Sequence, residues 1–102
     1  MCSSDLGASK AALHNFTKTL AMEWAKHRIR VNTLIPGQSL TAMPMVATPR
    51  DVLIEKAKTE IPLGRIGYPE DMAGLAMFLA SSDAAWMTGQ GVSMNGGAVL
   101  SP

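Results

Sequence analysis

The sequence predicts an α/β fold in which parallel strands are connected through helices. Two kinds of segment alternate along its 102 residues. Two segments repeat apolar residues every three or four positions, as amphipathic helices do, a third segment between prolines is predicted to be a short helix, and two short segments closed by glycine have the pattern of strands. Their order is α-β-loop-α-α-β. Strands joined through helices pair in parallel, because a tight hairpin cannot connect them.

Composition restricts the classes of protein to which the chain can belong. Its length suffices for one small domain, and with 47% hydrophobic and 17% charged residues it is globular rather than disordered. The net charge of +1 leaves no basic stripe for nucleic acid. No apolar run approaches the roughly 20 residues of a membrane span, and Cys2 alone forms no disulfide or cysteine metal site. We therefore expect a cytoplasmic protein that binds neither nucleic acid nor membrane.

The first six residues, Met-Cys-Ser-Ser-Asp-Leu, differ in character from the rest of the chain. They are mostly small and polar, and a helical pattern starts abruptly at Gly7. The end of a common sequencing adapter, translated with GTG as the start codon, encodes this hexapeptide. We therefore expect residues 1–6 to be an adapter artefact and residues 7–102 to belong to one domain. The alternative is a genuine start in which Ser3 or Ser4 caps the first helix.

The first predicted helix covers Gly7 to Lys26. Its apolar side chains recur at three- and four-residue steps and form one stripe, made of Leu13, Phe16, Leu20 and Trp24. Alanines keep the other faces slim, which suits a helix packed on more than one side. The basic residues Lys26, His27 and Arg28 lie at the end that the helix dipole makes favourable for positive charge.

The first predicted strand covers Ile29 to Ile35, where β-branched residues occupy the odd positions. Pro36 and Gly37 end it. Residues 38–49 contain two further prolines and no period, which predicts a loop. A short helix is predicted over Arg50 to Thr59, because prolines lie on both sides of it.

The third predicted helix begins at Pro69–Asp71, since proline fits the first helical turn and acidic residues there face the positive end of the dipole. Its expected buried face is made of Met72, Leu75, Ala76 and Leu79. Residues 81–83 end it. The last strand is predicted over Gly91 to Met94, and the glycines at 96 and 97 close it.

Four motifs in order resemble the C-terminal part of the short-chain dehydrogenases/reductases. Gly7–Leu13 resembles their active-site helix, which usually carries Tyr-x-x-x-Lys. Arg30–Gly37 resembles their sixth strand and the cofactor loop after it. Pro62–Asp71 resembles the lead-in to their late helix, and Thr88–Gly97 their final strand. The resemblance implies the C-terminal part of a Rossmann-type, doubly wound parallel sheet whose N-terminal half this sequence does not contain.

The sequence departs from the family pattern at several positions. Leu6 stands where the family has its catalytic tyrosine, four residues before Lys10. The glycine-rich phosphate loop, the upstream Asn-Ala-Gly turn and the catalytic serine do not occur. Asn95 replaces the commoner aspartate of Asp-Gly-Gly, and Ser39 replaces the usual Ile or Val. The resemblance therefore implies a truncated enzyme that is inactive by itself.

The resemblance assigns Lys10 to catalysis. The family's tyrosine acts as general acid or base, and its ordinary pKa of about 10 is too high for that role near neutrality. A lysine one helical turn later lies on the same face and stabilises the phenolate with its positive charge. The family's lysine also binds the nicotinamide ribose. Without the motif, Lys10 would be interpreted as a solvated helix lysine.

The resemblance also assigns a cofactor-binding loop to Pro36, Gly37, Ser39 and Thr41. These residues lie just after a strand, at its carboxyl end, where open α/β sheets bind ligands. Backbone amides there are expected to bind the nicotinamide carboxamide, and the Thr41 hydroxyl the pyrophosphate. The alternative is an ordinary turn at the end of a strand, which Pro-Gly alone would favour.

Residues 42–62 resemble the family's variable substrate lid. Their apolar members are Met43, Met45, Val46, Leu53 and Ile54. Flexible apolar side chains suit a hydrophobic substrate, but a packed lid helix would have the same pattern, and the sequence leaves both interpretations open.

Histidine and tryptophan residues are interpreted as structural. His14 and His27 lack metal-ligand spacing and an acidic partner, so we expect no metal site. We expect Trp24 and Trp86 to pack against other residues rather than to contact a cofactor.

Together these features predict part of an oxidoreductase that uses NAD or NADP and transfers hydride between nicotinamide and a carbonyl or alcohol substrate. The family's late helix and last strand form subunit contacts, which implies a homo-oligomer, either a dimer or a tetramer. The alternative is a natural, non-catalytic short form that keeps only these assembly surfaces and acts as an interaction module.

Overall fold

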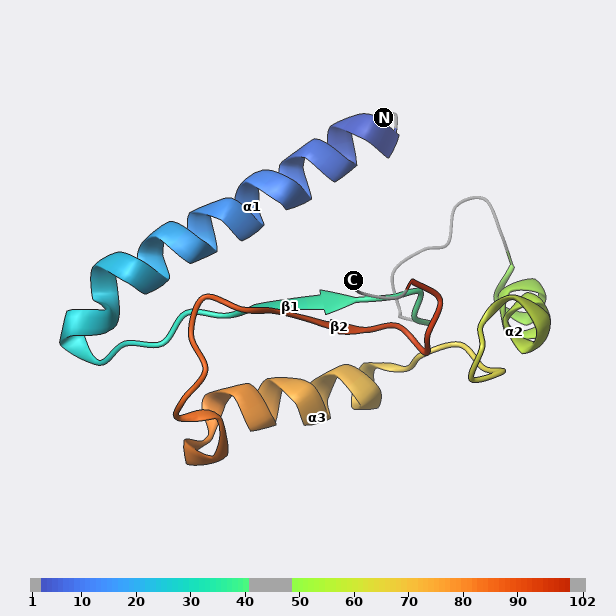
Figure 1. Ribbon diagram of the computed structural model, residues 1–102. Coiled ribbons are helices and arrows are strands. Elements are labelled where there is room, and N and C mark those ends of the chain that lie inside the picture. Colours follow the sequence, from blue (N-terminus) through green and yellow to red (C-terminus); the bar gives the residue numbers. More distant parts are fainter. Residues whose placement is uncertain (1–2, 41–48, 100–102) are drawn as a thin grey trace. The chain divides into compact units, whose positions relative to one another are not determined.

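The computed structural model describes residues 3–40 and 49–99 (Figure 1). Its elements, in chain order, are α1 (Ser3–Trp24), the 3-10 turn η1 (Ala25–His27), β1 (Thr33–Pro36), α2 (Arg50–Glu60), α3 (Pro69–Ala80), the 3-10 turn η2 (Ser82–Ala84) and β2 (Gly91–Met94). The predicted order of helices and strands is confirmed. The two 3-10 turns, each just after a helix, were not predicted.

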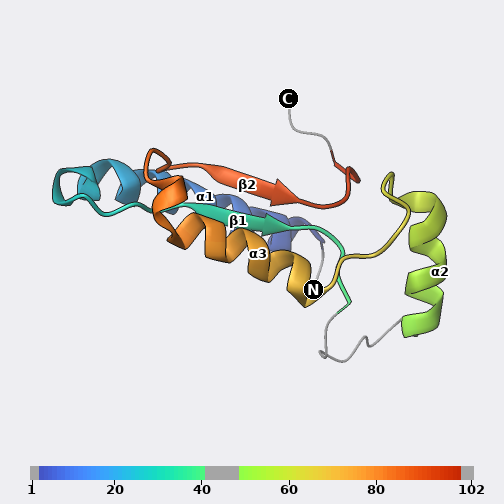
Figure 2. The same ribbon diagram turned by 90° about the horizontal axis from the view of Figure 1, so that it is seen from below.

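The strands β1 and β2 lie side by side and run in the same direction (Figure 2). The Thr33 amide donates to the Gln90 carbonyl at 2.8 Å, and the Gly37 amide donates to the Met94 carbonyl at 2.9 Å. Donor and acceptor therefore advance together along the chain, which defines a parallel pair. The predicted α/β class with parallel strands is confirmed.

The strand β1 starts later than the predicted Ile29. The residues before it bond to the turn that precedes β2: the Val31 amide donates to the Thr88 hydroxyl at 3.1 Å, and the Gly89 amide donates to the Val31 carbonyl at 2.8 Å. Gly89 has a φ of 73°, a conformation that glycine adopts without strain. Residues 29–32 are thus held as a connection to the sheet rather than as a strand.

The chain divides into two compact units, each with a small core of its own. The first contains Met1–Leu34 and Phe78–Val92, and the second contains Ile35–Met77 and Ser93–Pro102. In the first unit Ala21 and Ala84 are buried together with Thr17. The Thr17 hydroxyl donates to the Leu13 carbonyl at 3.0 Å, so its burial leaves no polar group unsatisfied.

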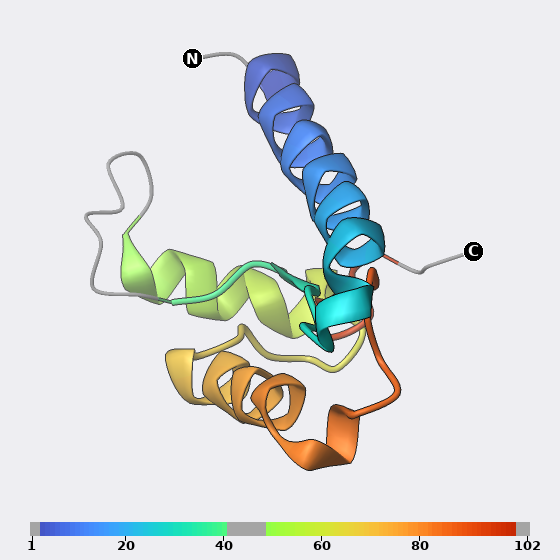
Figure 3. The same ribbon diagram turned by 90° about the vertical axis from the view of Figure 1, so that its left-hand side faces the viewer.

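The helix α1 begins before the predicted Gly7 and ends before the predicted Lys26. After it come η1 and Arg28, which has a φ of 61° (Figure 3). A left-handed residue just after a helix is a common way to end it. No helix among the described residues is both long and apolar enough to cross a bilayer.

Two polar residues of the Arg30–Gly37 motif stabilise the first unit. The Arg30 guanidinium donates to the carbonyls of Leu79 and Ser81, at 2.9 and 3.1 Å. These groups lie at the end of α3, where helical carbonyls lack intrahelical partners. Asn32 donates to the Met87 carbonyl at 3.1 Å and accepts from the Gln90 amide at 3.1 Å. Both side chains therefore anchor the segment that leads from α3 to β2.

The core of the second unit is formed by Leu40, Leu53, Ala57, Ile61 and Ile66, with Ile54 packed against it. Because Leu53 is buried in this cluster, it does not form part of an exposed substrate face, and the packed-helix interpretation of the lid holds for it. The other apolar lid residues, at 43, 45 and 46, lie outside the described residues. The helix α2 ends one residue later than predicted, at Glu60.

Two predictions about packing are wrong. In α3, Leu75 is buried and Met72 and Leu79 are half-buried, but Ala76 is exposed because no described element covers its side of the helix. Trp86 is fully exposed rather than packed, at 100% of its surface, and Trp24 is 40% exposed. Trp86 lies in the turn after η2, where the described residues provide no partner for its ring.

The apolar stripe of α1 is largely uncovered. Leu13 and Phe16 are each 59% exposed, and Leu20 is half-buried. Monomeric proteins rarely expose contiguous apolar patches of this kind unless another surface covers them. The sheet that the structure describes has two strands. A pair of strands is marginally stable without further packing.

We expect the 102-residue chain, expressed alone, to associate or to unfold easily. Exposing two large apolar side chains forfeits about 1.5–3 kcal/mol each, against a total stability of about 5–15 kcal/mol for whole domains. Light scattering and chemical denaturation of the purified chain measure both properties. A monodisperse monomer with a cooperative transition at high denaturant concentration would contradict this expectation.

Candidate functional site

The loop after β1 lies against the turn after β2. Besides the hydrogen bond from Gly37 to Met94, the α-carbon of Gly37 approaches Asn95 so closely that a side chain has no space. A β-carbon built on Gly37 would overlap the Asn95 β-carbon and lie 2.6 Å from its α-carbon. Glycine is therefore required here by close approach of two backbones.

The same loop is held on its other side by the lead-in to α3. Ser39 and Gly67 form a parallel bridge, in which the Leu40 amide donates to the Gly67 carbonyl at 2.8 Å and the Gly67 amide donates to the Gln38 carbonyl at 3.2 Å. In this pattern the flanking residues make the bonds, so the Ser39 amide points away from Gly67. None of the hydrogen bonds within the described residues uses that amide. The Ser39 amide therefore faces the side of the loop opposite Gly67.

The structure brings only some of the predicted site residues together. Pro36 is the last residue of β1, and Gly37 and Ser39 lie in the loop that follows it, all within the second unit. Lys10 is exposed on α1, in the first unit, and Leu6 occupies the position one helical turn before it. Thr41 lies outside the described residues.

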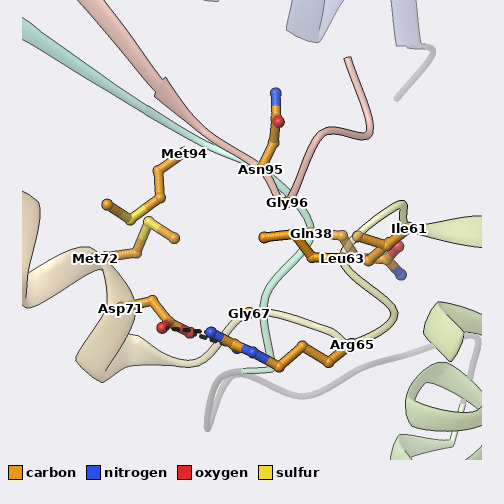
Figure 4. Close-up of a pocket in the computed structure, with 10 residues that line it drawn as sticks. All are labelled: Gln38, Ile61, Leu63, Arg65, Gly67, Asp71, Met72, Met94, Asn95 and Gly96. Carbon is orange, nitrogen blue, oxygen red and sulfur yellow. Dashed lines mark hydrogen bonds and ion pairs between the residues drawn. The ribbon is translucent and has the colours of Figure 1, made fainter. Parts of the chain in front are cut away.

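A pocket of about 230 Å³ adjoins this loop (Figure 4). Met72 of α3 and Met94 of β2 both line it, together with Gln38 of the loop. Its lining residues are Gln38, Ile61, Leu63, Arg65, Gly67, Asp71, Met72, Met94, Asn95 and Gly96. Its walls are mainly apolar and its polar groups come from the loop, the turn after β2 and one ion pair.

That ion pair joins Arg65 to Asp71. Its two parallel hydrogen bonds, from the two terminal nitrogens of Arg65 to the two carboxylate oxygens, are each 2.9 Å long, a geometry that makes the pair strong and specific. The Tyr68 amide also donates to this carboxylate, at 2.8 Å. The hydrogen bond from Arg65, and next the one from Tyr68, lower the pKa of Asp71 to about 2. The same contact raises the pKa of Arg65.

Neither this pair nor the contact of Gly37 with Asn95 was predicted from the sequence. The sequence analysis interprets Asp71 only as an acidic residue that faces the positive end of the dipole of the third helix. The signal available was spacing: Asp71 lies three residues after Tyr68 at a helix start, as in the acidic half of a capping box. No sequence signal pairs Gly37 with Asn95, because these residues are far apart in the chain.

The histidines have no catalytic partner among the described residues. His14 lies with its Nδ1 3.4 Å from the Thr33 hydroxyl, and His27 is exposed. The structural or surface role that the sequence predicts is consistent with this placement. The described residues contain no group of three or more His, Cys, Asp or Glu side chains that could hold a metal ion.

We expect Asp71→Asn to lower the thermal midpoint of the chain in a pH-dependent way. The folded pKa of about 2 lies below the ordinary 3.8. The pair therefore stabilises the fold above about pH 3.8, and this contribution is lost as the pH falls through 2. Midpoints of the variant and the wild type, measured from neutral to strongly acidic pH, should converge over this range.

Glu55→Gln is the matched control. It removes an exposed ion pair with Lys58 of the same length, 2.9 Å, and pairs of this kind contribute little. A difference between Asp71→Asn and the wild type that stayed constant down to pH 2 would refute the role of the carboxylate.

Two glycine substitutions should have opposite effects. Gly37→Ala should destabilise the chain by about 1–3 kcal/mol, because its methyl group overlaps Asn95. Gly74→Ala, inside α3 and with no atom within 4 Å of the new methyl group, should stabilise it by about 0.5–1 kcal/mol. Urea denaturation measures both. Equal effects would show that Gly37 is not constrained by contact.

Comparison with known proteins shows the family. Residues 3–99 match the model of the family described as "Enoyl-(Acyl carrier protein) reductase". The chain is 42% identical over 94 residues to an acetoacetyl-CoA reductase of an Acinetobacter species, covering 92% of the chain and 37% of that protein. It is 44% identical over 90 residues to an NAD-dependent glycerol dehydrogenase of Listeria innocua, covering 88% of the chain and 35% of that protein.

A solved structure agrees with the sequence matches. YwfH, an NADPH-dependent reductase involved in bacilysin biosynthesis, superposes with a TM-score of 0.77 at 37% identity, over 90% of the chain and 38% of YwfH. The chain thus spans well under half the length of the relatives that it matches. The likeness in both sequence and fold shows that the chain belongs to the short-chain dehydrogenase/reductase family of oxidoreductases.

Proposed function

We propose that this chain is the C-terminal part of an oxidoreductase that transfers hydride between NAD or NADP and a small carbonyl or alcohol substrate. The observation that carries the proposal is the loop Pro36–Ser39, which leaves a parallel strand at its carboxyl end and directs the Ser39 amide away from the residues that hold it. Open α/β sheets bind ligands at such positions.

The loop fits one end of a nicotinamide cofactor. The Ser39 amide donates to the carboxamide oxygen, and the close contact of Gly37 with Asn95 fixes the start of the loop that carries this amide. Thr41 binds the pyrophosphate with its hydroxyl. The cofactor, when bound, supplies or accepts the hydride.

Lys10 lowers the pKa of the residue that gives or takes the reacting proton. Position 6, one turn before it on α1, is the place of the family's tyrosine. A cationic ammonium on the same helical face lowers the pKa of a phenol toward neutrality, which makes it an effective acid or base. Lys10 also donates to the ribose hydroxyls. With Leu6 in place of tyrosine the chain has no proton donor and is inactive by itself.

The proposal extends to the origin of the first six residues. Residues 1–6 derive from a sequencing adapter, and the protein continues upstream of Gly7 with the tyrosine, the catalytic serine and the glycine-rich phosphate loop. The whole protein assembles as a dimer or tetramer through α3 and β2. The exposed apolar residues of α3, Met77 and Phe78, support such a contact.

The second candidate is a non-catalytic short form that acts as an interaction module. The exposed stripe of α1 and the exposed Trp86 favour it, because apolar surface of this extent is typical of a surface that another protein covers. Genomic sequence upstream of Gly7 separates the two candidates. An open frame with a tyrosine codon at position 6 supports the truncated enzyme, and a stop codon ahead of a true start supports the module.

The activity test uses the whole reading frame beside the 102-residue chain. With NADH or NADPH and a panel of ketones, the whole protein should turn over and the short chain should not. In the whole protein Lys10→Ala should lower kcat by about a hundredfold or more. Lys18→Ala, an exposed lysine on the same helix, is the control and should be neutral. Turnover by the short chain, or full activity of Lys10→Ala, would refute the proposed mechanism.

A further inference from the structure

We propose that Asn95 is a site of spontaneous deamidation, and that its isoaspartyl product releases the loop after β1 from the turn after β2. Asn95 stands directly before Gly96 and Gly97, at a position where the family pattern commonly has aspartate. The inference goes beyond the proposed function, because it concerns a reaction of the chain itself and requires no cofactor.

The reaction needs only the chain and water. The backbone nitrogen of Gly96 attacks the side-chain carbonyl carbon (Cγ) of Asn95, so that a C–N bond forms and the bond from Cγ to Nδ2 breaks. Nδ2 leaves as ammonia and carries away the proton that the Gly96 nitrogen loses. Water then opens the cyclic imide at one of its two carbonyls. Opening at Cγ gives aspartate, and opening at the backbone carbonyl gives isoaspartate, whose main chain runs through the β-carbon and Cγ.

The attacking nitrogen of Gly96 is unhindered. None of the hydrogen bonds within the described residues uses its amide. Gly96 has no side chain to block the attack, and the fold requires glycine here: its φ is 65°, and a β-carbon built on it would lie 2.7 Å from the Ile61 Cγ2 atom. The same contact that excludes other residues therefore leaves Asn95 next to an accessible amide.

Two hydrogen bonds hold the side chain that is attacked. The Gly97 amide donates to the Asn95 Oδ1 atom at 2.9 Å and closes an Asx turn around the Gly96 nitrogen. The Nδ2 group donates to the Val99 carbonyl at 2.9 Å, in a bond that is exposed to solvent. The donor on Oδ1 stabilises the negative charge that develops on this oxygen during the attack, and a held side chain samples fewer unproductive orientations. The turn therefore promotes the reaction, and water reaches it.

The two products differ in their effect on the neighbouring loop. A β-carbon on Gly37 would overlap the β-carbon of Asn95 and lie 2.6 Å from its α-carbon. Aspartate keeps both of these atoms and the path of the main chain. Isoaspartate moves the β-carbon into the main chain and lengthens it between the Met94 carbonyl, which accepts from Gly37, and the Gly96 carbonyl, which accepts from Leu63. The added length shifts the turn, so only isoaspartate removes the support of the loop.

Peptide mass spectrometry of the 102-residue chain, incubated at mildly alkaline pH, measures the reaction. Asn95 should deamidate about tenfold faster than Asn15 and Asn32, neither of which precedes a glycine. Its rate in buffer should be about tenfold higher than in urea, which removes the hydrogen bond from Gly97. A synthetic peptide of residues 91–99 in both solutions corrects for the effect of urea on the chemistry. A corrected rate in buffer that is equal to or below that in urea, or a rate no higher than those of the other two asparagines, would overturn the inference.

Amide hydrogen exchange then separates the two products. The isoaspartyl form is purified from the aged chain by chromatography, and fresh Asn95→Asp protein is the matched control. In the isoaspartyl form the peptide that covers residues 35–40 should lose about tenfold of its protection, the effect of about one hydrogen bond, whereas Asn95→Asp should keep it. A peptide from α1, in the other unit, is the internal reference and should not change.

Three results would refute the effect on the loop: wild-type protection in the isoaspartyl form, an equal loss in Asn95→Asp, or a fresh wild-type loop that exchanges like an unfolded peptide. None of these measurements involves NADH or a substrate. They therefore leave the proposed function to its own activity test, and failure of that test leaves the deamidation site in place.

Discussion

The parallel pairing of β1 with β2 is the constraint on which the rest of the second unit depends. Its register places Gly37 against Met94 and Asn95. The backbones of Gly37 and Asn95 lie so close together that a β-carbon on Gly37 has no space. The end of β2 therefore determines the path of the loop that follows β1. A shift of the register would replace glycine with a bulkier residue at this contact and separate the strands.

The loop beyond this contact is held in place by hydrogen bonds of the backbone. Backbone amides have no rotamers, so an amide held by its neighbours is fixed in direction without a loss of side-chain entropy. Here the neighbours are the turn at 94–97 on one side and Gly67 on the other. The direction of the Ser39 amide therefore depends little on the identity of the side chain at this position.

The two units differ in how much of their apolar surface they use. The second buries a cluster of five residues around Ile66. In the first, buried positions are small, and the large residues of the α1 stripe remain exposed. The helix α1 packs through the small residues Ala21 and Thr17 and exposes Leu13 and Phe16. A further layer of protein over the exposed face would bury these large apolar side chains.

The sequence by itself determined the fold class, the order of the elements and the family, because periodicity, capping residues and ordered motifs are local in the chain. Its assignment of cofactor binding to Pro36, Gly37, Ser39 and Thr41 stays a prediction. Only the tertiary structure decided that Arg65 pairs with Asp71, that Trp86 and Ala76 are exposed, and that Asn95 meets Gly37. Burial and long-range contact depend on which surfaces meet after the strands pair, and no local pattern in the chain encodes that meeting.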